Sequence, residues 1–162
     1  MKTKRVILLA IIILFLITQL TGCSKEKNNL DQISPLDKNR ISIISISFAN
    51  SVTKNVTDKE LIDTLLRSLD KIKFSKMSIK QEEEVFQERK ILNLGSTYLI
   101  QLMEQKMGIS QADIIVISEK ELLLVDSETM RNSRTVLYTN QNDESSLNSV
   151  KEIYLLVKEA VE

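Results

Sequence analysis

The sequence predicts an α+β domain in which an antiparallel sheet of about five or six strands packs one face against two helices. Three observations lead to this fold class. Short stretches alternate apolar and polar residues, which is typical of strands. Two longer stretches repeat apolar residues at spacings of three and four, which is typical of amphipathic helices. The strands in the second half follow one another through short connections, which favours antiparallel neighbours. The expected order is one strand, one helix, about five strands and a final helix.

The first strand is expected over Ile41–Phe48. Ile44, Ile46 and Phe48 alternate with serines and would face the core, whereas Ile41 and Ile43 alternate in the opposite phase. This change of phase indicates either a β-bulge or simply the entrance of the strand.

The first helix follows a polar turn. Thr57 is expected to be its N-cap, with Glu60 completing a capping box and Val56 packing against Leu61 as a hydrophobic staple. The helix should end near Lys71, whose charge suits the C-terminal end of the helix dipole. Its apolar face comprises Leu61, Ile62, Leu65, Leu66 and Leu69.

Residues 72–89 support neither period for long, so we expect an extended segment followed by a short charged helix or loop. Glu82, Glu83 and Glu84 could suggest a cation site. A calcium loop, however, needs alternating ligands and a turning glycine, and this stretch has no glycine. We therefore expect the three carboxylates to lie on a solvated face.

The remaining strands are expected at residues 90–94, 97–103, 112–118, 122–126 and 134–139. Gly95 and Ser96 would join the first two in a tight hairpin, and residues 119–121 would join the third to the fourth. Residues 114–117 and 122–125 are apolar on both faces, which predicts central strands covered by a helix or by another chain. A final helix from about Asp143 would cover one sheet face with Leu147, Val150, Tyr154, Val157 and Val161.

The N-terminal segment has the composition of a targeting signal. Lys2, Lys4 and Arg5 form a basic region, residues 6–17 are all apolar, and Leu20-Thr21-Gly22-Cys23 closes the segment. Twelve helical residues reach about 18 Å, against about 30 Å for the hydrocarbon core of a bilayer. The alternative is an uncleaved membrane helix running on through Leu20, but Thr18 and Gln19 interrupt it.

These residues resemble the signal of bacterial lipoproteins. In that family the residues that match Leu20, Thr21 and Gly22 form the lipobox recognised by the signal peptidase, and a diacylglyceryl group is attached to the cysteine that matches Cys23. The resemblance implies that residues 1–22 are removed and that Cys23 anchors the protein at the extracytoplasmic face of the cell membrane. Two acyl chains suffice for stable attachment.

The organisation behind this signal is expected to be simple. Residues 23–40 would form the lipidated cysteine and a polar tether that contains the only proline, Pro35, and residues 41–162 a single globular domain. With its signal, its tether and its strand-to-helix entrance at Thr57, the chain resembles small lipoproteins of Gram-positive bacteria that carry one domain of unknown function.

Several kinds of chemistry are excluded by composition. The chain has no histidine, and its one cysteine, Cys23, would be consumed by lipid. Removal of residues 1–22 takes three basic residues and no acidic one, which changes the formal net charge from 0 to −3 and disfavours nucleic acid as a partner. Three Ser-x-x-Lys matches occur, Ser24 with Lys27, Ser51 with Lys54 and Ser68 with Lys71, and they carry little information because serine and lysine are both frequent in this chain. We expect no catalytic residue, no cofactor and no metal site.

Three classes of function remain. The preferred hypothesis is a non-catalytic module that binds an envelope or membrane protein near the membrane surface. The alternative is a small-ligand-binding or sensing lipoprotein. The third is a histidine-free hydrolase, which would need two carboxyl groups about 5–9.5 Å apart in a cleft.

Overall fold

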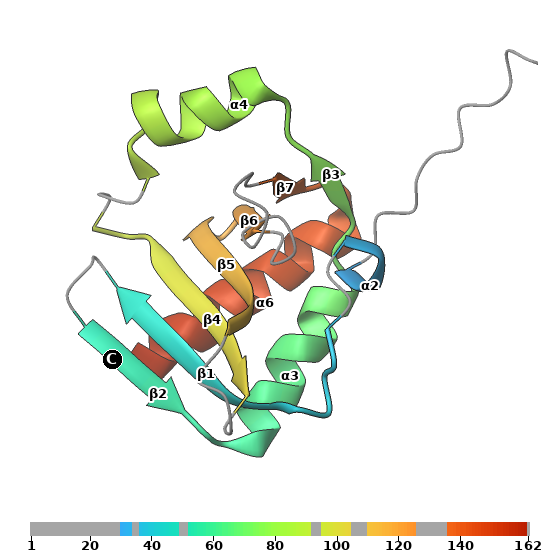
Figure 1. Ribbon diagram of the computed structural model, residues 1–162, viewed down its shortest axis with the longest axis vertical. Helices are drawn as coiled ribbons and strands as arrows, with labels where there is room; N and C mark the ends of the chain where they lie inside the picture. Colours follow the sequence, from blue (N-terminus) through green and yellow to red (C-terminus); the bar gives the residue numbers. More distant parts are fainter. Residues whose placement is uncertain are drawn as a thin grey trace, which may run out of the picture.

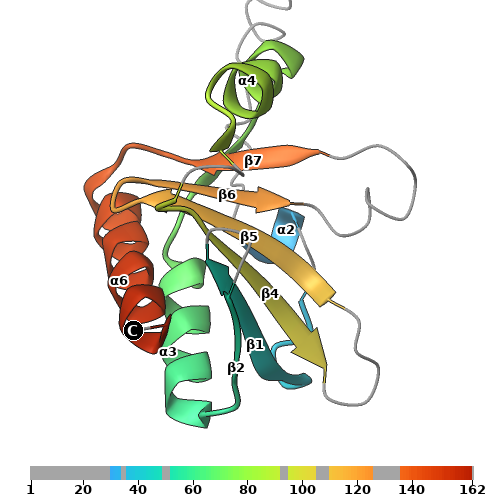
Figure 2. The same ribbon diagram turned by 90° about the vertical axis from the view of Figure 1, so that its left-hand side faces the viewer.

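The computed structural model describes residues 30–33, 36–48, 52–91, 95–104, 110–125 and 136–161. Its centre is one sheet of seven strands in the order β2-β1-β4-β5-β6-β7-β3, with every neighbouring pair antiparallel. Helices α3 (Lys59–Asp70) and α6 (Glu144–Val161) cover the same face of the sheet (Figures 1 and 2). The predicted α+β class with two helices on one face is confirmed, and the sheet has more strands than expected.

The additional strands lie at the edges of the sheet. The seven strands are β1 Ile41–Phe48, β2 Val52–Val56, β3 Phe74–Lys76, β4 Tyr98–Glu104, β5 Ser110–Ser118, β6 Glu121–Val125 and β7 Leu137–Asn140. The polar turn expected before the first helix is the edge strand β2, and the extended segment expected after it is the edge strand β3. Thr53, Lys54 and Asn55 are all exposed, so β2 lacks the alternation by which a half-buried strand is recognised.

The hairpin predicted for residues 90–94 and 97–103 is wrong. The neighbours of β4 are β1 and β5, which leaves no free side for another strand. Lys90 instead has a left-handed backbone with φ 47°, and Ile91 lies in a single helical turn. Residues 92–94 lie outside the described residues.

The change of phase in β1 is a bulge. Ile41 pairs with Glu104 and Ile43 with Met103, so Ser42 is an extra residue on the β1 side. The bulge brings Ile41 onto the same sheet face as Ile44, and both are buried in the core beneath the helices.

The expected N-cap of the first helix is displaced by one residue. Helix α3 begins at Lys59, and Asp58 rather than Thr57 caps it, with the Asp58 carboxylate accepting a 2.8 Å hydrogen bond from the backbone N–H of Leu61. A carboxylate is preferred at this position because its charge strengthens the hydrogen bond and interacts favourably with the helix dipole. The predicted capping box between Thr57 and Glu60 is therefore not formed, while the predicted apolar face packs in the core as expected.

Helix α6 turns a slightly different face to the sheet than its apolar spacing suggested. Val150 and Val157 are buried as predicted, but Leu147, Tyr154 and Val161 are only half-buried. The buried face of α6 is completed by Ser146, Ser149 and Ile153. Small hydroxyl side chains at a helix contact allow the backbone to lie close to its neighbours.

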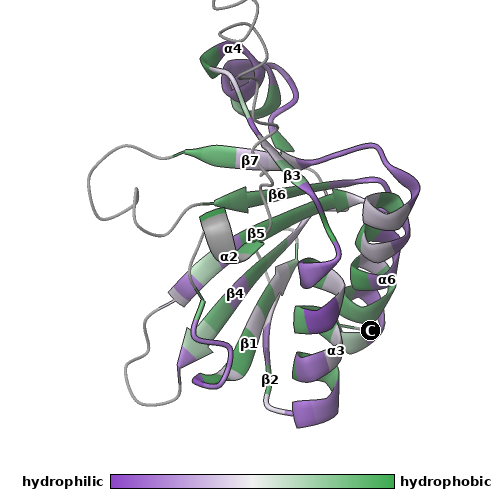
Figure 3. Ribbon diagram, turned by 90° about the vertical axis from the view of Figure 1, so that its right-hand side faces the viewer, coloured by the Kyte–Doolittle hydropathy of each residue, from purple (hydrophilic) through white to green (hydrophobic). Residues whose placement is uncertain are grey.

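Residues 77–91 cover the part of the second sheet face formed by β5, β6 and β7. This segment contains α4 (Ile79–Glu83) and a π-helical turn (Glu84–Glu88), which agrees with the expected short charged helix. Its apolar side chains and those of the sheet form a second core made of Met77, Val85, Ile91, Ile115, Ile117, Leu123, Val125 and Leu137. The prediction that residues 114–117 and 122–125 form central strands covered on both faces is confirmed, and Figure 3 shows the hydrophobic character of β5 and β6.

The polar tether predicted for residues 23–40 is wrong from Leu30 onward. Leu30 and Ile33, in the short helix α2 (Leu30–Ile33), are 1% and 7% exposed and belong to the core under the helices, and Leu36 packs against it. Three polar contacts hold the following residues: Lys38 to Asp70 at 2.6 Å, Arg40 to Glu104 at 2.6 Å, and the backbone N–H of Asp37 to the Gln111 side chain at 3.1 Å. The folded domain therefore begins at least as early as Leu30.

Candidate functional site

The residues predicted for signal processing and lipid attachment are Leu20, Thr21, Gly22 and Cys23. They lie outside the described residues, so their roles remain predictions. None of the helices that the structure describes is both long and apolar enough to cross a membrane.

The one Ser-x-x-Lys match that lies wholly in the described residues is structural. Ser68 is 1% exposed, and its hydroxyl is 2.7 Å from the carboxylate of Glu152 and 3.0 Å from the carbonyl oxygen of Thr64. The bond to Glu152 joins α3 to α6, and the buried hydroxyl serves this contact between helices. Lys71 is the exposed C-cap residue of α3. Ser24, Lys27 and Ser51 lie outside the described residues.

The acidic run of α4 behaves as a solvated face. Glu83 and Glu84 are exposed and Glu82 is half-buried. Within the described ranges, no group of three or more acidic, histidine or cysteine side chains is arranged to hold a metal ion. Elsewhere, carboxylates pair with cations that connect separate elements, as Arg89 does with Glu121 through bonds of 2.7 and 2.8 Å. This pair fastens the end of the covering segment to the start of β6.

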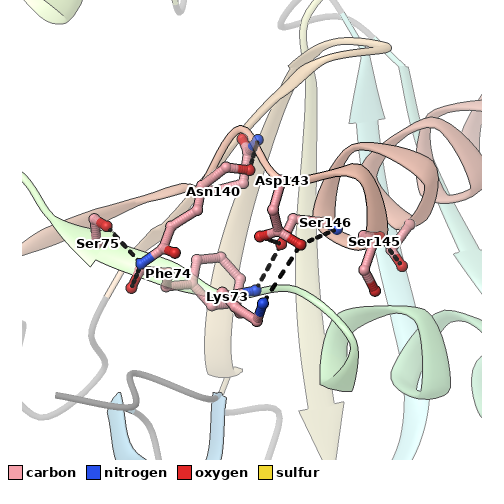
Figure 4. A network of polar contacts seen from close by, with 9 residues as sticks. Lys73, Phe74, Ser75, Asn140, Asp143, Ser145 and Ser146 are labelled. Atoms are coloured by element: carbon pink, nitrogen blue, oxygen red, sulfur yellow. Dashed lines mark hydrogen bonds and ion pairs between the residues drawn. The ribbon is translucent and has the colours of Figure 1, made fainter. Parts of the chain in front are cut away.

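A network of polar groups, some buried and some exposed, lies where β3, β7 and α6 meet (Figure 4). Asp143 precedes α6, and its carboxylate accepts hydrogen bonds from the hydroxyl of Ser146 at 2.8 Å and its backbone N–H at 3.3 Å. These bonds, and the ammonium group of Lys73 at 3.6 Å, lower the pKa of Asp143 below its ordinary value. The hydroxyl of Ser146 in turn accepts a 3.0 Å bond from the backbone N–H of Lys73.

The same network continues to the strands. The side-chain oxygen of Asn140 accepts a 2.8 Å bond from the backbone N–H of Leu122, and its NH₂ group donates to the carbonyl oxygen of Lys120 at 3.1 Å. The side-chain NH₂ of Gln141 donates to the hydroxyl of Ser75 at 3.0 Å. Because these donors and acceptors bond to one another, the network fixes the corner of the fold at which β3, β6, β7 and α6 meet.

A groove of about 500 Å³ lies between residues 38–42 and α3. Its floor contains the buried side chains of Ile41 and Ile62. Its rim is polar, with two lysines, one carboxylate and three uncharged groups: Lys38, Lys59, Asp63, Asn39, Ser42 and Thr57. Lys38 already pairs with Asp70, so the charges available in the groove are mixed and few.

A second groove of about 420 Å³ runs between α3 and α6. Its apolar part is formed by Leu61, Leu156 and Ala160, and its acidic rim by Asp58, Glu60 and Glu159. The two grooves flank the N-terminal half of α3, which places Lys59 and Asp63 on one side and Glu60 and Leu61 on the other. We call them the larger groove and the smaller groove below.

Sequence reasoning did not find either groove. The larger groove lies where residues 38–42 pass α3, and the sequence signal that this part of the chain docks on the domain is the apolar spacing of Leu30, Ile33 and Leu36. No family model, curated protein or solved structure matches this chain. The function is therefore argued from the geometry.

Proposed function

We propose that the protein is a non-catalytic lipoprotein, anchored through a diacylglyceryl group on Cys23 to the extracytoplasmic face of the cell membrane, whose domain binds an envelope or membrane protein. The observation that best supports this is the position of Leu30. Only six residues separate Cys23 from a side chain fixed in the core, so an anchored domain would stay close to the bilayer. A partner would have to be an envelope protein, or the extracytoplasmic part of a membrane protein, that lies within reach of the anchored domain.

The chemistry of the described surface supports binding rather than catalysis. The polar network at the corner and the buried Ser68 connect elements of the fold. The exposed part of the smaller groove combines an apolar strip with Glu60 and Glu159, a combination that suits a partner presenting apolar and basic side chains. The proposal therefore places the partner contact at this groove.

The test is crosslinking in living cells, with a photoreactive amino acid in place of Glu60 in the smaller groove and, as a control, in place of Lys76 on the edge strand β3. Both positions are exposed. We expect one protein to be recovered through Glu60 and not through Lys76, and to be lost when Cys23→Ser removes the lipid. Equal recovery through both positions, or full recovery without the lipid, would contradict the proposal.

A small-ligand receptor is the second candidate, because about 500 Å³ is within the range of ligand pockets. Binding of a compound with micromolar affinity that is abolished by Asp63→Ala would favour it over the protein-binding function. A histidine-free hydrolase gains no comparable support. The larger groove holds one carboxylate, Asp63, whereas the reaction needs two. In the smaller groove Asp58 caps α3, and Glu60 and Glu159 are exposed. A general acid instead needs a sheltered position that raises its pKa.

A further inference from the structure

We propose that the face of the domain that carries α2 is held against the lipid surface, and that the C-terminal end of α6 points away from it. This inference rests on the proposed lipid anchor. It adds an orientation, which anchoring by itself does not require.

The connection between the lipid-bearing Cys23 and the folded domain is short. Seven Cα-to-Cα steps join Cys23 to Leu30. Fully extended, they span about 25 Å, and a flexible chain of this length averages about 15 Å. Leu30 is 1% exposed, so the connection ends at a fixed point of the fold.

The size of the domain limits how far it can turn on this connection. A domain of about 130 residues has a radius of gyration of about 14 Å, which corresponds to a sphere about 36 Å across. The connection is shorter than this diameter. The domain cannot turn over and bring the side opposite Leu30 to the bilayer, because the connection would first have to run around the domain.

Leu30 lies in α2, on one side of the domain. Helix α2 contacts α3 and lies on the side of the domain that faces the viewer in Figure 3, where residues 36–40 run down from α2 toward β1. The C-terminal end of α6 and strand β2 lie toward the opposite side, at the left of Figure 1. Leu156, Glu159 and Ala160 of the smaller groove belong to this membrane-distal end of α6.

The charges on the α2 side show what kind of contact this is. Lys38 pairs with Asp70 at 2.6 Å, and Arg40 pairs with Glu104 at 2.6 Å. Paired cations gain little from anionic phospholipid. The orientation is therefore attributed to the length of the connection and not to these two cations.

Fluorescence energy transfer to acceptor lipids tests the orientation. Cys23 is the one cysteine of the chain and would be blocked by lipid, so an introduced cysteine can be labelled alone. Asn39→Cys and Glu159→Cys place a donor at exposed positions on the α2 side and near the end of α6. The lipidated full-length variants are labelled and reconstituted into phosphatidylcholine vesicles, with and without phosphatidylglycerol.

We expect several-fold more efficient transfer from position 39 than from position 159 in both kinds of vesicle. A matched pair with 20 Gly and Ser residues inserted after Glu26 should lose most of this difference, since the longer chain lets the domain turn over. Equal transfer from both positions in vesicles that float with the protein would overturn the orientation while leaving the anchor intact. Failure of the protein to float with vesicles would overturn the anchor, and with it the basis of the inference.

Discussion

Replacing Leu30 by Ala tests whether the chain is docked on the domain as early as α2. The Leu30 side chain is 1% exposed in the main core, where loss of a leucine side chain costs about 2–5 kcal/mol. We expect a loss of about 2–3 kcal/mol in the free energy of unfolding, near the lower limit, because α2 is a single turn whose surroundings can partly collapse. Leu155→Ala is the matched control. Leu155 is 48% exposed, so this change should cost less than about 0.5 kcal/mol.

The assay is urea unfolding of the soluble chain that begins at residue 24, followed by circular dichroism. Leu30→Ala should lower the urea concentration at the midpoint of unfolding and leave the slope of the free energy against urea unchanged. An unchanged slope means that stability changes while the surface exposed on unfolding does not. If Leu30→Ala unfolds like Leu155→Ala, α2 is not docked. The free connection would then reach about 45 Å to Leu36, longer than the domain is wide, and the argument for a fixed orientation would fail.

Three further predictions concern local contacts. Asp58→Ala should lower the free energy of unfolding by about 1 kcal/mol in the same urea assay, whereas Thr57→Ala should have little effect. A larger loss for Thr57→Ala than for Asp58→Ala would show that Thr57 is the N-cap, as the sequence suggested. Arg89→Ala should cost about 0.2–1 kcal/mol, because both partners of its pair with Glu121 are about one-third exposed, and should speed proteolysis within residues 77–91; unchanged proteolysis would show that the pair does not hold this segment. Because the pKa of Asp143 is lowered in the folded protein, its contribution to stability is present above the ordinary carboxyl pKa and is lost as the pH falls through the folded pKa. Asp143→Asn should therefore reduce the loss of stability between neutral and acid pH. An unchanged loss would refute the assignment.

The elements predicted correctly are those whose apolar spacing persists over at least two turns or several alternations. Helix α3 and strand β1 meet this condition, and each packs its apolar residues in the main core. The two-faced apolar character of β5 and β6 also predicted their central place, because only a strand covered on both sides needs it.

The elements that sequence reasoning missed depend on partners far away in the chain. Strand β4 pairs with β1, whose residues lie 50 or more positions earlier, and this pairing is what removes the expected local hairpin. Strand β2 is exposed and polar, and β3 has three residues, so neither carries a readable period. The short charged helix expected in residues 72–89 is α4, but its start was not predicted, because the capping box of Ser78 and Gln81 lies in a stretch of weak periodicity.

The candidate site was less predictable than the fold. Both grooves require residues from segments that meet only after folding, such as Thr57 with Asn39 in the larger groove and Leu61 with Leu156 in the smaller one. The exclusions by composition needed no structure, since the missing histidines are visible in the sequence. A surface that binds by shape leaves no comparable mark in a single sequence.

The two edges of the sheet affect how copies of this protein behave when they are crowded. An open edge strand exposes backbone donors and acceptors to which a second sheet can add, which is how soluble β-proteins begin to aggregate. Here β2 exposes Lys54 and the three-residue β3 exposes Lys76. Two copies that joined edge to edge would bring like charges together and would share few hydrogen bonds. Both features disfavour fibril formation through the edges of the sheet when the local density of the protein is high.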